Sequence, residues 1–312
     1  MIFAARGLMV SLAFFATVYC ALSLLTLLAW WSAKRIGLAT GADSANILFG
    51  LRVFPFAVSA VVTVFFTFPS FWLMERPALD EDAGTFILAL GSLCILGAGL
   101  YRVLRVHAQT TRAVERWLAG AANIDRVAST PTTLSVAQGA PPLVLVGIRR
   151  PRVMISDAAA TLLTDGELQV AIRHELSHAR SWDNLKRALV SATPFPGMGS
   201  LEKAWQEAAE LAADYGAVAS RQEALDLAAA LIKLSRSFQP LSQPVLATEL
   251  VSGPSSINRR VDRLLKWRMA GQSSRHGWPW ALPVLLIVIV GIVSNYGAAL
   301  VLTHRLTELL VP

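Results

Sequence analysis

Two histidines four positions apart, with a glutamate directly after the first, are the residues whose spacing most directly suggests chemistry. They are His174, Glu175 and His178, in the stretch "AIRHELSHARSWDN". On a helix, positions i and i+4 share a face, so both imidazoles can bind one metal ion. Glu175 can then reach a water held by that ion and take its proton. The spacing predicts a catalytic Zn²⁺ site, and the alternative is a helix that carries two ordinary histidines.

A catalytic zinc also needs a third protein ligand and an open fourth position. The downstream stretch "EAAELAAD" offers two candidates, Glu207 and Glu210. Asp214 lies four residues after Glu210, so it shares a helical face with it and can accept a hydrogen bond from a ligand imidazole. On the residues alone, Glu210 is favoured only modestly over Glu207.

The elements that must position these residues are mostly helices, with two short strand segments before them. The first motif lies on a predicted helix over 163–181, where Thr164 and Glu167 form a capping-box pattern. The third-ligand motif lies on a helix over 200–220, with Ser200 as its expected cap. The remaining predicted elements are strands within 132–138 and 141–156 and helices over 223–238 and 255–269.

The composition predicts an integral membrane protein. The chain has 312 residues, 54% of them hydrophobic and only 16% charged, with a mean hydropathy of +0.51. Four apolar runs are long enough to cross a bilayer, at about 8–31, 48–73, 86–104 and 279–302. The expected fold is mainly α, with these four spans, a mixed helix-and-strand domain at 105–278 and a short tail at 303–312. Cys20 and Cys94 lie inside apolar runs and offer neither zinc-ligand spacing nor a disulfide framework.

The charges that flank the runs predict an orientation. The loop between the second and third runs carries four acids and one base. Positive charges follow the first and third runs and precede the fourth: Lys34, Arg35, Arg52, Arg102, Arg105, Arg112, Arg116, Arg259, Arg260, Arg263, Lys266, Arg268 and Arg275. The positive-inside rule then places 105–278 in the cytoplasm and both termini outside. The net charge of +7 is therefore mostly juxtamembrane, which favours contact with the lipid bilayer over direct binding of nucleic acid.

Four stretches of the chain resemble a known family. "RRPRVMIS", "GELQVAIRHELSHARSWDNL", "PFPG" and "ELAAD" look like the M56 membrane zinc peptidases, the BlaR1/MecR1-type antibiotic-sensing transducers, over roughly 85–280. They resemble the Ste24- and HtpX-like M48 proteases more distantly. The short link between the two motifs, broken by Pro194, Pro196 and Gly197, has no room for a further span and favours M56.

The resemblance assigns roles to individual residues. It implies a gluzincin-like α+β domain with a small β-sheet. In this domain His174, His178 and Glu210 bind one Zn²⁺. The resemblance therefore strongly favours Glu210 over Glu207 as the third ligand. It makes Glu175 the general base. Asp214 then supports a ligand imidazole, and Asp183 matches the family's aspartate after the zinc helix, with a local helix cap as the alternative for Asp183.

The resemblance also implies an activity. We expect a zinc endopeptidase of the bacterial inner membrane that cleaves a cytoplasmic regulator, such as a transcriptional repressor, and also itself, in signal transduction. The alternatives are an M48-like quality-control or processing protease that acts on membrane proteins, and a non-catalytic zinc-binding transducer. A homodimer or a sensor partner is a further expectation. Only about ten residues follow the fourth run, so the protease core is expected without the penicillin-binding sensor domain.

Two further expectations concern substrate contacts. Tyr215 and Arg221 follow the third-ligand motif and can donate to a developing oxyanion, with structural roles as the alternative. The strands within 143–155 can offer a sheet edge that pairs with an extended substrate.

Overall fold

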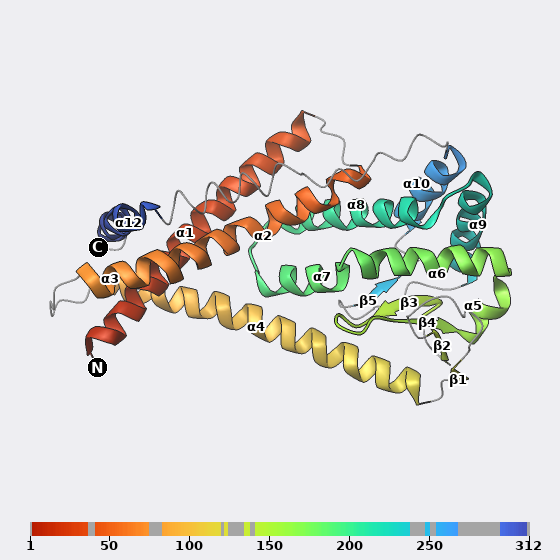
Figure 1. Ribbon diagram of the computed structural model, residues 1–312, viewed down its shortest axis with the longest axis horizontal. Coiled ribbons are helices and arrows are strands. Elements are labelled where there is room, and N and C mark those ends of the chain that lie inside the picture. Colours follow the sequence, from red (N-terminus) through yellow and green to blue (C-terminus); the bar gives the residue numbers. More distant parts are fainter. Residues whose placement is uncertain are drawn as a thin grey trace.

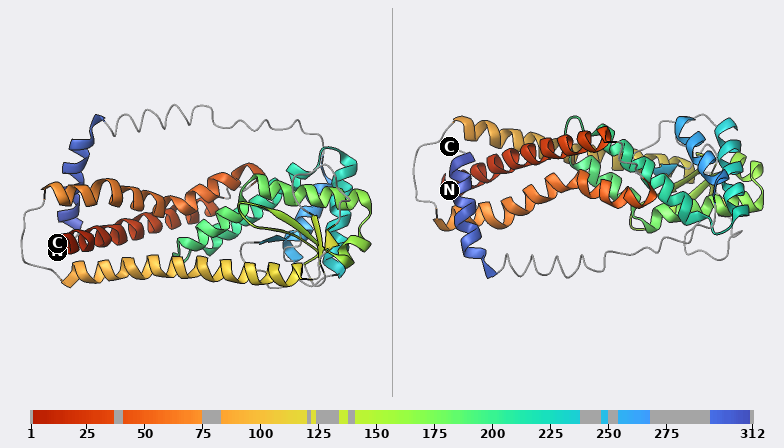
Figure 2. Two further views of the ribbon diagram at one scale, coloured as in Figure 1. Left: turned by 60° about the horizontal axis from the view of Figure 1, so that its bottom comes forward. Right: turned by 90° about the horizontal axis from the view of Figure 1, so that it is seen from above.

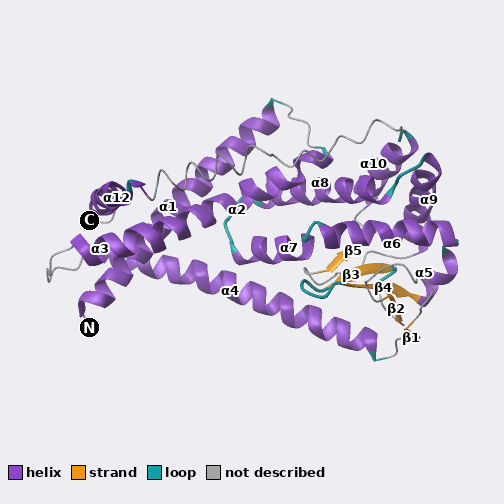
Figure 3. Ribbon diagram, in the orientation of Figure 1, coloured by secondary structure: helices purple, strands orange, loops and turns teal. Residues whose placement is uncertain are grey.

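The structure is a computed structural model, and long helices at one end adjoin a smaller domain of helices and one sheet (Figure 1, Figure 3). The two ends of the chain lie at the end of the helical bundle that is farthest from the sheet (Figure 1). The described residues are 2–36, 41–74, 83–119, 122–123, 134–137, 141–237, 247–249, 254–267 and 294–310.

Three of the four predicted spans are helices long and apolar enough to cross a membrane. The first is α1 (Ile2–Arg35) and the third is α4 (Ala83–Leu118), which extends well beyond the predicted span of 86–104. The second begins with the short turn η1 (Ala42–Ser44) and is continuous thereafter. It consists of α2 (Ala45–Val62), the π-helical turn η2 (Thr63–Thr67) and α3 (Phe68–Met74).

The fourth predicted span, 279–302, lies mostly outside the described residues. Its described end belongs to α12 (Tyr296–Leu310), which lies across the far end of α1 and α3 (Figure 2). The Tyr296 hydroxyl donates to the carbonyl of Phe65 in η2 at 2.8 Å. Residues 303–310 therefore continue a helix, where a short tail was predicted.

The domain contains one sheet of five described strands, in the order β1-β2-β4-β3-β5. The strands are β1 (Ala122–Asn123), β2 (Leu134–Ala137), β3 (Leu143–Val146), β4 (Arg152–Ser156) and β5 (Ala247–Glu249). The pairing of β2 with β4 is parallel and the other pairings are antiparallel. Within this sheet β3 and β4 are both inner strands, so the expectation that they offer a free edge is wrong for the described chain.

The alternating side chains of β3 explain where the sheet lies. Leu143 and Leu145 pack into the main core with α6 (Asp165–Arg180) and α9 (Arg221–Ser237). Val144 and Val146 face the other way and pack against the end of α4 at Val114 and Trp117. Because successive strand residues point to opposite faces, the sheet is enclosed between α4 and the helical layer (Figure 1).

The helices around the two motifs form largely as predicted. At the start of α6 the capping box is present, since Thr164 and Glu167 each accept from the other's backbone N–H. The other helices of the domain are α5 (Asp157–Leu162), α7 (Asp183–Ala192), α8 (Gly199–Ala217) and α10 (Pro254–Leu265). The expected Ser200 cap is wrong, because α8 begins at Gly199 and the Ser200 hydroxyl instead accepts from the Trp30 indole of α1 at 3.0 Å.

The membrane helices pack directly against the end of α7. The Tyr19 hydroxyl of α1 donates to the carbonyl of Pro194 at 3.0 Å. On α4, a Cβ added to Gly99 would lie 2.1 Å from the carbonyl oxygen of Ala192. This approach is possible only because glycine has no side chain, so α4 and the end of α7 are in close backbone contact at this point.

We predict that Gly99→Ala destabilises the protein while Gly97→Ala does not. A methyl group at 99 forces α4 away from α7, and such overpacking costs about 1–3 kcal/mol. A Cβ at Gly97 meets no described atom within 4 Å, so the second variant keeps or slightly raises the stability. The measurement is the thermal unfolding midpoint of both variants in the same detergent, and equal midpoints would contradict the close packing.

Candidate metal centre

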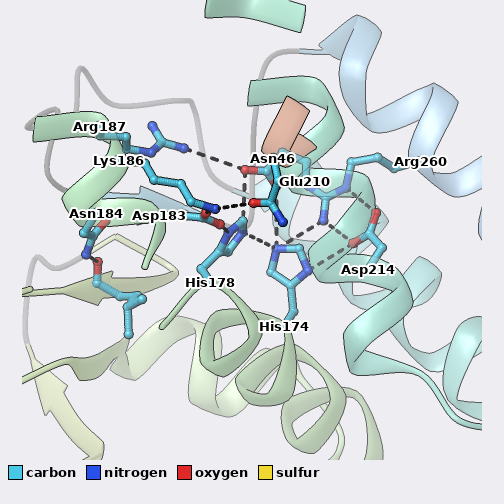
Figure 4. Close-up of polar contacts among 11 residues, drawn as sticks. Asn46, His174, His178, Asp183, Asn184, Lys186, Arg187, Glu210, Asp214 and Arg260 are labelled. Atoms are coloured by element: carbon cyan, nitrogen blue, oxygen red, sulfur yellow. Dashed lines mark hydrogen bonds and ion pairs between the residues drawn. The ribbon is translucent and has the colours of Figure 1, made fainter. Parts of the chain in front are cut away.

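Helices α6 and α8 bring the three predicted metal ligands together (Figure 4). His174 and His178 on α6 and Glu210 on α8 are buried, and their candidate ligand atoms all lie within 4.8 Å of one another. The two Nε2 atoms are 3.2 Å apart. The Glu210 carboxylate oxygens lie 3.6 Å from Nε2 of His174 and 3.7 Å from Nε2 of His178. Three potential ligand atoms therefore converge on one point.

The other ring nitrogens show that this donor set suits a metal ion. Nδ1 of His174 lies 3.0 Å from an oxygen of Asp214, and Nδ1 of His178 lies 2.6 Å from an oxygen of Asp183. A carboxylate that accepts from Nδ1–H fixes the tautomer and leaves the Nε2 lone pair for a metal. Two such imidazoles and one carboxylate are a common ligand set of catalytic zinc sites. The residues present therefore fit a catalytic metal ion.

Asp183 reaches His178 because the chain turns sharply between α6 and α7. Trp182 adopts a left-handed conformation with φ of 57°, which costs a non-glycine residue about 1–2 kcal/mol. After it, Asn184 donates from Nδ2 to the carbonyl of Gly147 at 3.0 Å, which fixes the start of α7 beside β3. Of the two roles that the sequence left open for Asp183, the structure shows the contact with the imidazole.

Arg260 is the site residue that the sequence analysis missed. It lies on α10 with only 2% of its surface exposed. Nη2 and Nε donate to the two oxygens of Asp214 at 2.6 and 2.8 Å, and Nη1 lies 3.1 Å from Glu210. Reading Arg260 as a charge beside the membrane was therefore wrong. A signal was present in the sequence, because Arg260 shares a helical face with Ile257 and Leu264, and a charge on a buried apolar face needs a partner.

The site is highly charged although it is buried. Burial by itself lowers the pKa of His178, but the carboxylates of Glu210, Asp183 and Glu175 outweigh burial and raise this pKa to about 10. Burial likewise opposes the charge of Glu210, yet His178 and Arg260 hold the pKa of its carboxyl well below the usual range. A histidine must be deprotonated to bind a metal ion, so a metal ion at this site would compete with the proton of His178.

The two other predicted glutamates, Glu175 and Glu207, differ in burial and in their charged partners. Glu175 is fully buried on α6, and its charge contributes to the raised pKa of both His178 and Arg260. Glu207, the rival ligand, instead pairs with Arg259 at the surface at 3.0 Å.

The two residues proposed to stabilise the oxyanion lie at the surface. Tyr215 is 53% exposed, and Arg221 is exposed at the start of α9. Their proposed role stays a prediction.

Comparison with known families assigns the chain. The family model described as BlaR1 peptidase M56 matches residues 86–264, which is more than half of the 312-residue chain. The protein belongs to the M56 peptidase family. The match begins in α4 and ends in α10, so the M56 region contains both the candidate metal ligands and Arg260. A membrane metalloprotease is what this family implies, and the three apolar helices agree with it. A comparison with curated proteins found no match.

We predict that Glu210→Gln weakens metal binding by the M56 peptidase and that Glu207→Gln does not. The first change removes a negatively charged ligand from a buried site, so we expect the dissociation constant for zinc to rise at least about 100-fold. The second change touches only a surface ion pair and keeps the constant of the wild type. Competition with a chromophoric chelator measures both, and a larger loss in Glu207→Gln would reverse the ligand assignment.

A second pair of variants tests the role of Arg260 in the metal-free protein. Arg260→Met leaves the buried carboxylates of Asp214 and Glu210 without their guanidinium, which we expect to cost about 3–5 kcal/mol. Arg259→Met, the neighbouring control, removes the exposed ion pair with Glu207, which is worth about 0–1 kcal/mol. Thermal midpoints measured with excess chelator give the comparison, and equal midpoints for the two variants would contradict the assigned role.

Proposed function

We propose that this M56 peptidase is a zinc-dependent endopeptidase of the bacterial inner membrane. It cleaves a protein regulator, such as a transcriptional repressor, at the cytoplasmic face and so transmits a signal. The observation that carries this proposal is the convergence of His174, His178 and Glu210 on one point, with the fully buried Glu175 next to His174 on the same helix. A purely structural metal site does not need that glutamate.

The chemistry follows from the roles of the side chains. A zinc ion bound by His174, His178 and Glu210 would polarise the scissile carbonyl and lower the pKa of a water molecule. Glu175 would take a proton from the water whose oxygen attacks the carbonyl carbon, and would later give that proton to the departing amine nitrogen as the C–N bond breaks. Asp214 and Asp183 keep the two imidazoles in the tautomer and orientation that binding requires.

Arg260 acts through the ligands as a positioning residue. Its guanidinium lies between Asp214 and Glu210 and balances their negative charges. A fixed cation at this place holds the Glu210 carboxylate toward the imidazoles, and the two bonds to Asp214 hold that carboxylate against His174. The site is thereby preorganised by contacts from α10, outside the two ligand helices.

The charges on α4 support the cytoplasmic placement. Arg102, Arg105, Arg112 and Arg116 lie on the part of α4 that runs toward the sheet, and all four are exposed. Arginines at this end of a membrane helix favour the cytoplasmic side. The ends of the chain lie at the opposite end of the bundle (Figure 1), as expected for extracytoplasmic termini.

The test of the proposed function is the variant Glu175→Gln, which keeps the shape of the side chain but cannot accept the proton. We expect zinc binding like that of the wild type, with cleavage of a random fluorogenic peptide pool lowered about 10²- to 10⁴-fold. In cells, the protein termini that appear when the wild type is expressed should be missing when the variant is expressed.

Each other outcome has a clear meaning. Cleavage by Glu175→Gln at the rate of the wild type would show that another group is the base. Zinc binding by both proteins, with no peptide cleaved and no new termini from either, would favour the non-catalytic transducer. New termini confined to damaged membrane proteins would favour the quality-control protease.

A further inference from the structure

A chain of side chains connects the start of a membrane helix to a metal ligand (Figure 4). The Lys186 ammonium on α7 donates to Oδ1 of Asn46 in the first turn of α2 at 2.8 Å. The same ammonium lies 3.5 Å from Oδ1 of Asp183, whose Oδ2 lies 2.6 Å from Nδ1 of His178. Three contacts thus join Asn46 to an atom of the ligand ring.

The position of Lys186 depends on α2. A lysine side chain has several rotatable bonds, and a half-exposed ammonium is readily taken up by water. Here the side chain of Lys186 is only 15% exposed. Asn46 accepts from the ammonium, and the ring of Phe49, one turn later on the same face of α2, lies 5.6 Å from it. Two side chains of α2 therefore hold the cation beside the buried Asp183.

A second, independent contact holds α2 on α7. Arg52, two turns after Asn46, is 2% exposed. It donates from Nη2 to the carbonyl of Thr193 at 2.7 Å and pairs with Glu202 of α8 at 2.8 Å. The sequence analysis counted Arg52 among the flanking charges that set the topology, whereas the structure shows it buried in protein. The start and the end of α7 are both attached to α2.

We infer that the first turn of α2 is a positioning element of the metal centre and that Asn46 is its key residue. By holding Lys186 against Asp183, Asn46 keeps the carboxylate oriented toward His178 and so raises the affinity for the metal. The docking of a membrane helix on α7 thereby sets how firmly a ligand is held. This inference rests on the proposed zinc site and adds a route by which a movement of the span reaches it.

The experiment compares zinc affinities of the full chain in lipid nanodiscs, measured by competition with a chromophoric chelator. Because outer-shell contacts to zinc ligands are worth about 10- to 100-fold in affinity, we expect Lys186→Met to weaken binding about 10-fold and Asn46→Ala at least about 3-fold. Asn46→Asp keeps an acceptor for the ammonium and should stay within about 2-fold of the wild type. Ile47→Ala is the matched control, since Ile47 is the next residue and 58% exposed.

The double variant Asn46→Ala/Lys186→Met shows whether the effect runs through Lys186. If it does, the double variant binds zinc as weakly as Lys186→Met alone, because residues of one network are not additive. An affinity of Asn46→Ala equal to that of Ile47→Ala, or losses that add in the double variant, would overturn the inference. A wild type that binds no zinc would instead overturn the proposed function, so the two failures are distinguishable.

Discussion

Two buried carboxylates lie beside the Nδ1 atoms of the two imidazoles in the candidate metal site, and the arrangement around the site depends on them. Asp214 faces His174 and Asp183 faces His178, both at hydrogen-bonding distance. A buried carboxylate needs a compensating cation, because an unpaired charge in protein is costly. Asp214 has Arg260 of α10, and Asp183 has Lys186, which α2 holds in place. The ligand helices α6 and α8 therefore do not form a complete site by themselves.

The part of the site that could be predicted from sequence is the part that is local. His174 and His178 are four residues apart, as are Glu210 and Asp214, so helical periodicity alone places each pair on one face, and Glu175 is next to the first histidine. Arg260 lies 46 residues from Asp214, and Lys186 lies 140 residues from Asn46. No local pattern specifies such pairs. Only the charge on an otherwise apolar face of α10 indicated that Arg260 has a buried partner. Nothing in the sequence indicated the contact between Lys186 and Asn46.

The fold shows the same division between local and tertiary information. Length and hydropathy were enough to predict α1, the helix from α2 to α3, and α4. The sequence did not show that Arg52 is buried in protein, because the positive-inside rule counts charges beside each span and contains no information on their burial. In the sheet, β3 and β4 lie in the stretch expected to form strands, whereas β1 and β5 have only two and three residues, too few to show an alternation. The two edge strands of the described sheet, β1 and β5, therefore could not be predicted from an alternation of apolar and polar residues.

The membrane helices share their packing with the domain that carries the candidate metal site. Leu48 of α2 lies in one core cluster with Trp205 and Leu201 of α8, the helix that also carries Glu210. Gly99 of α4 approaches the end of α7 so closely that a single methyl group would not fit. Well-packed interfaces of this kind shift between discrete arrangements more readily than they deform continuously. Both α2 and α4 contact the end of α7, and this helix begins at Asp183, whose carboxylate lies 2.6 Å from Nδ1 of His178.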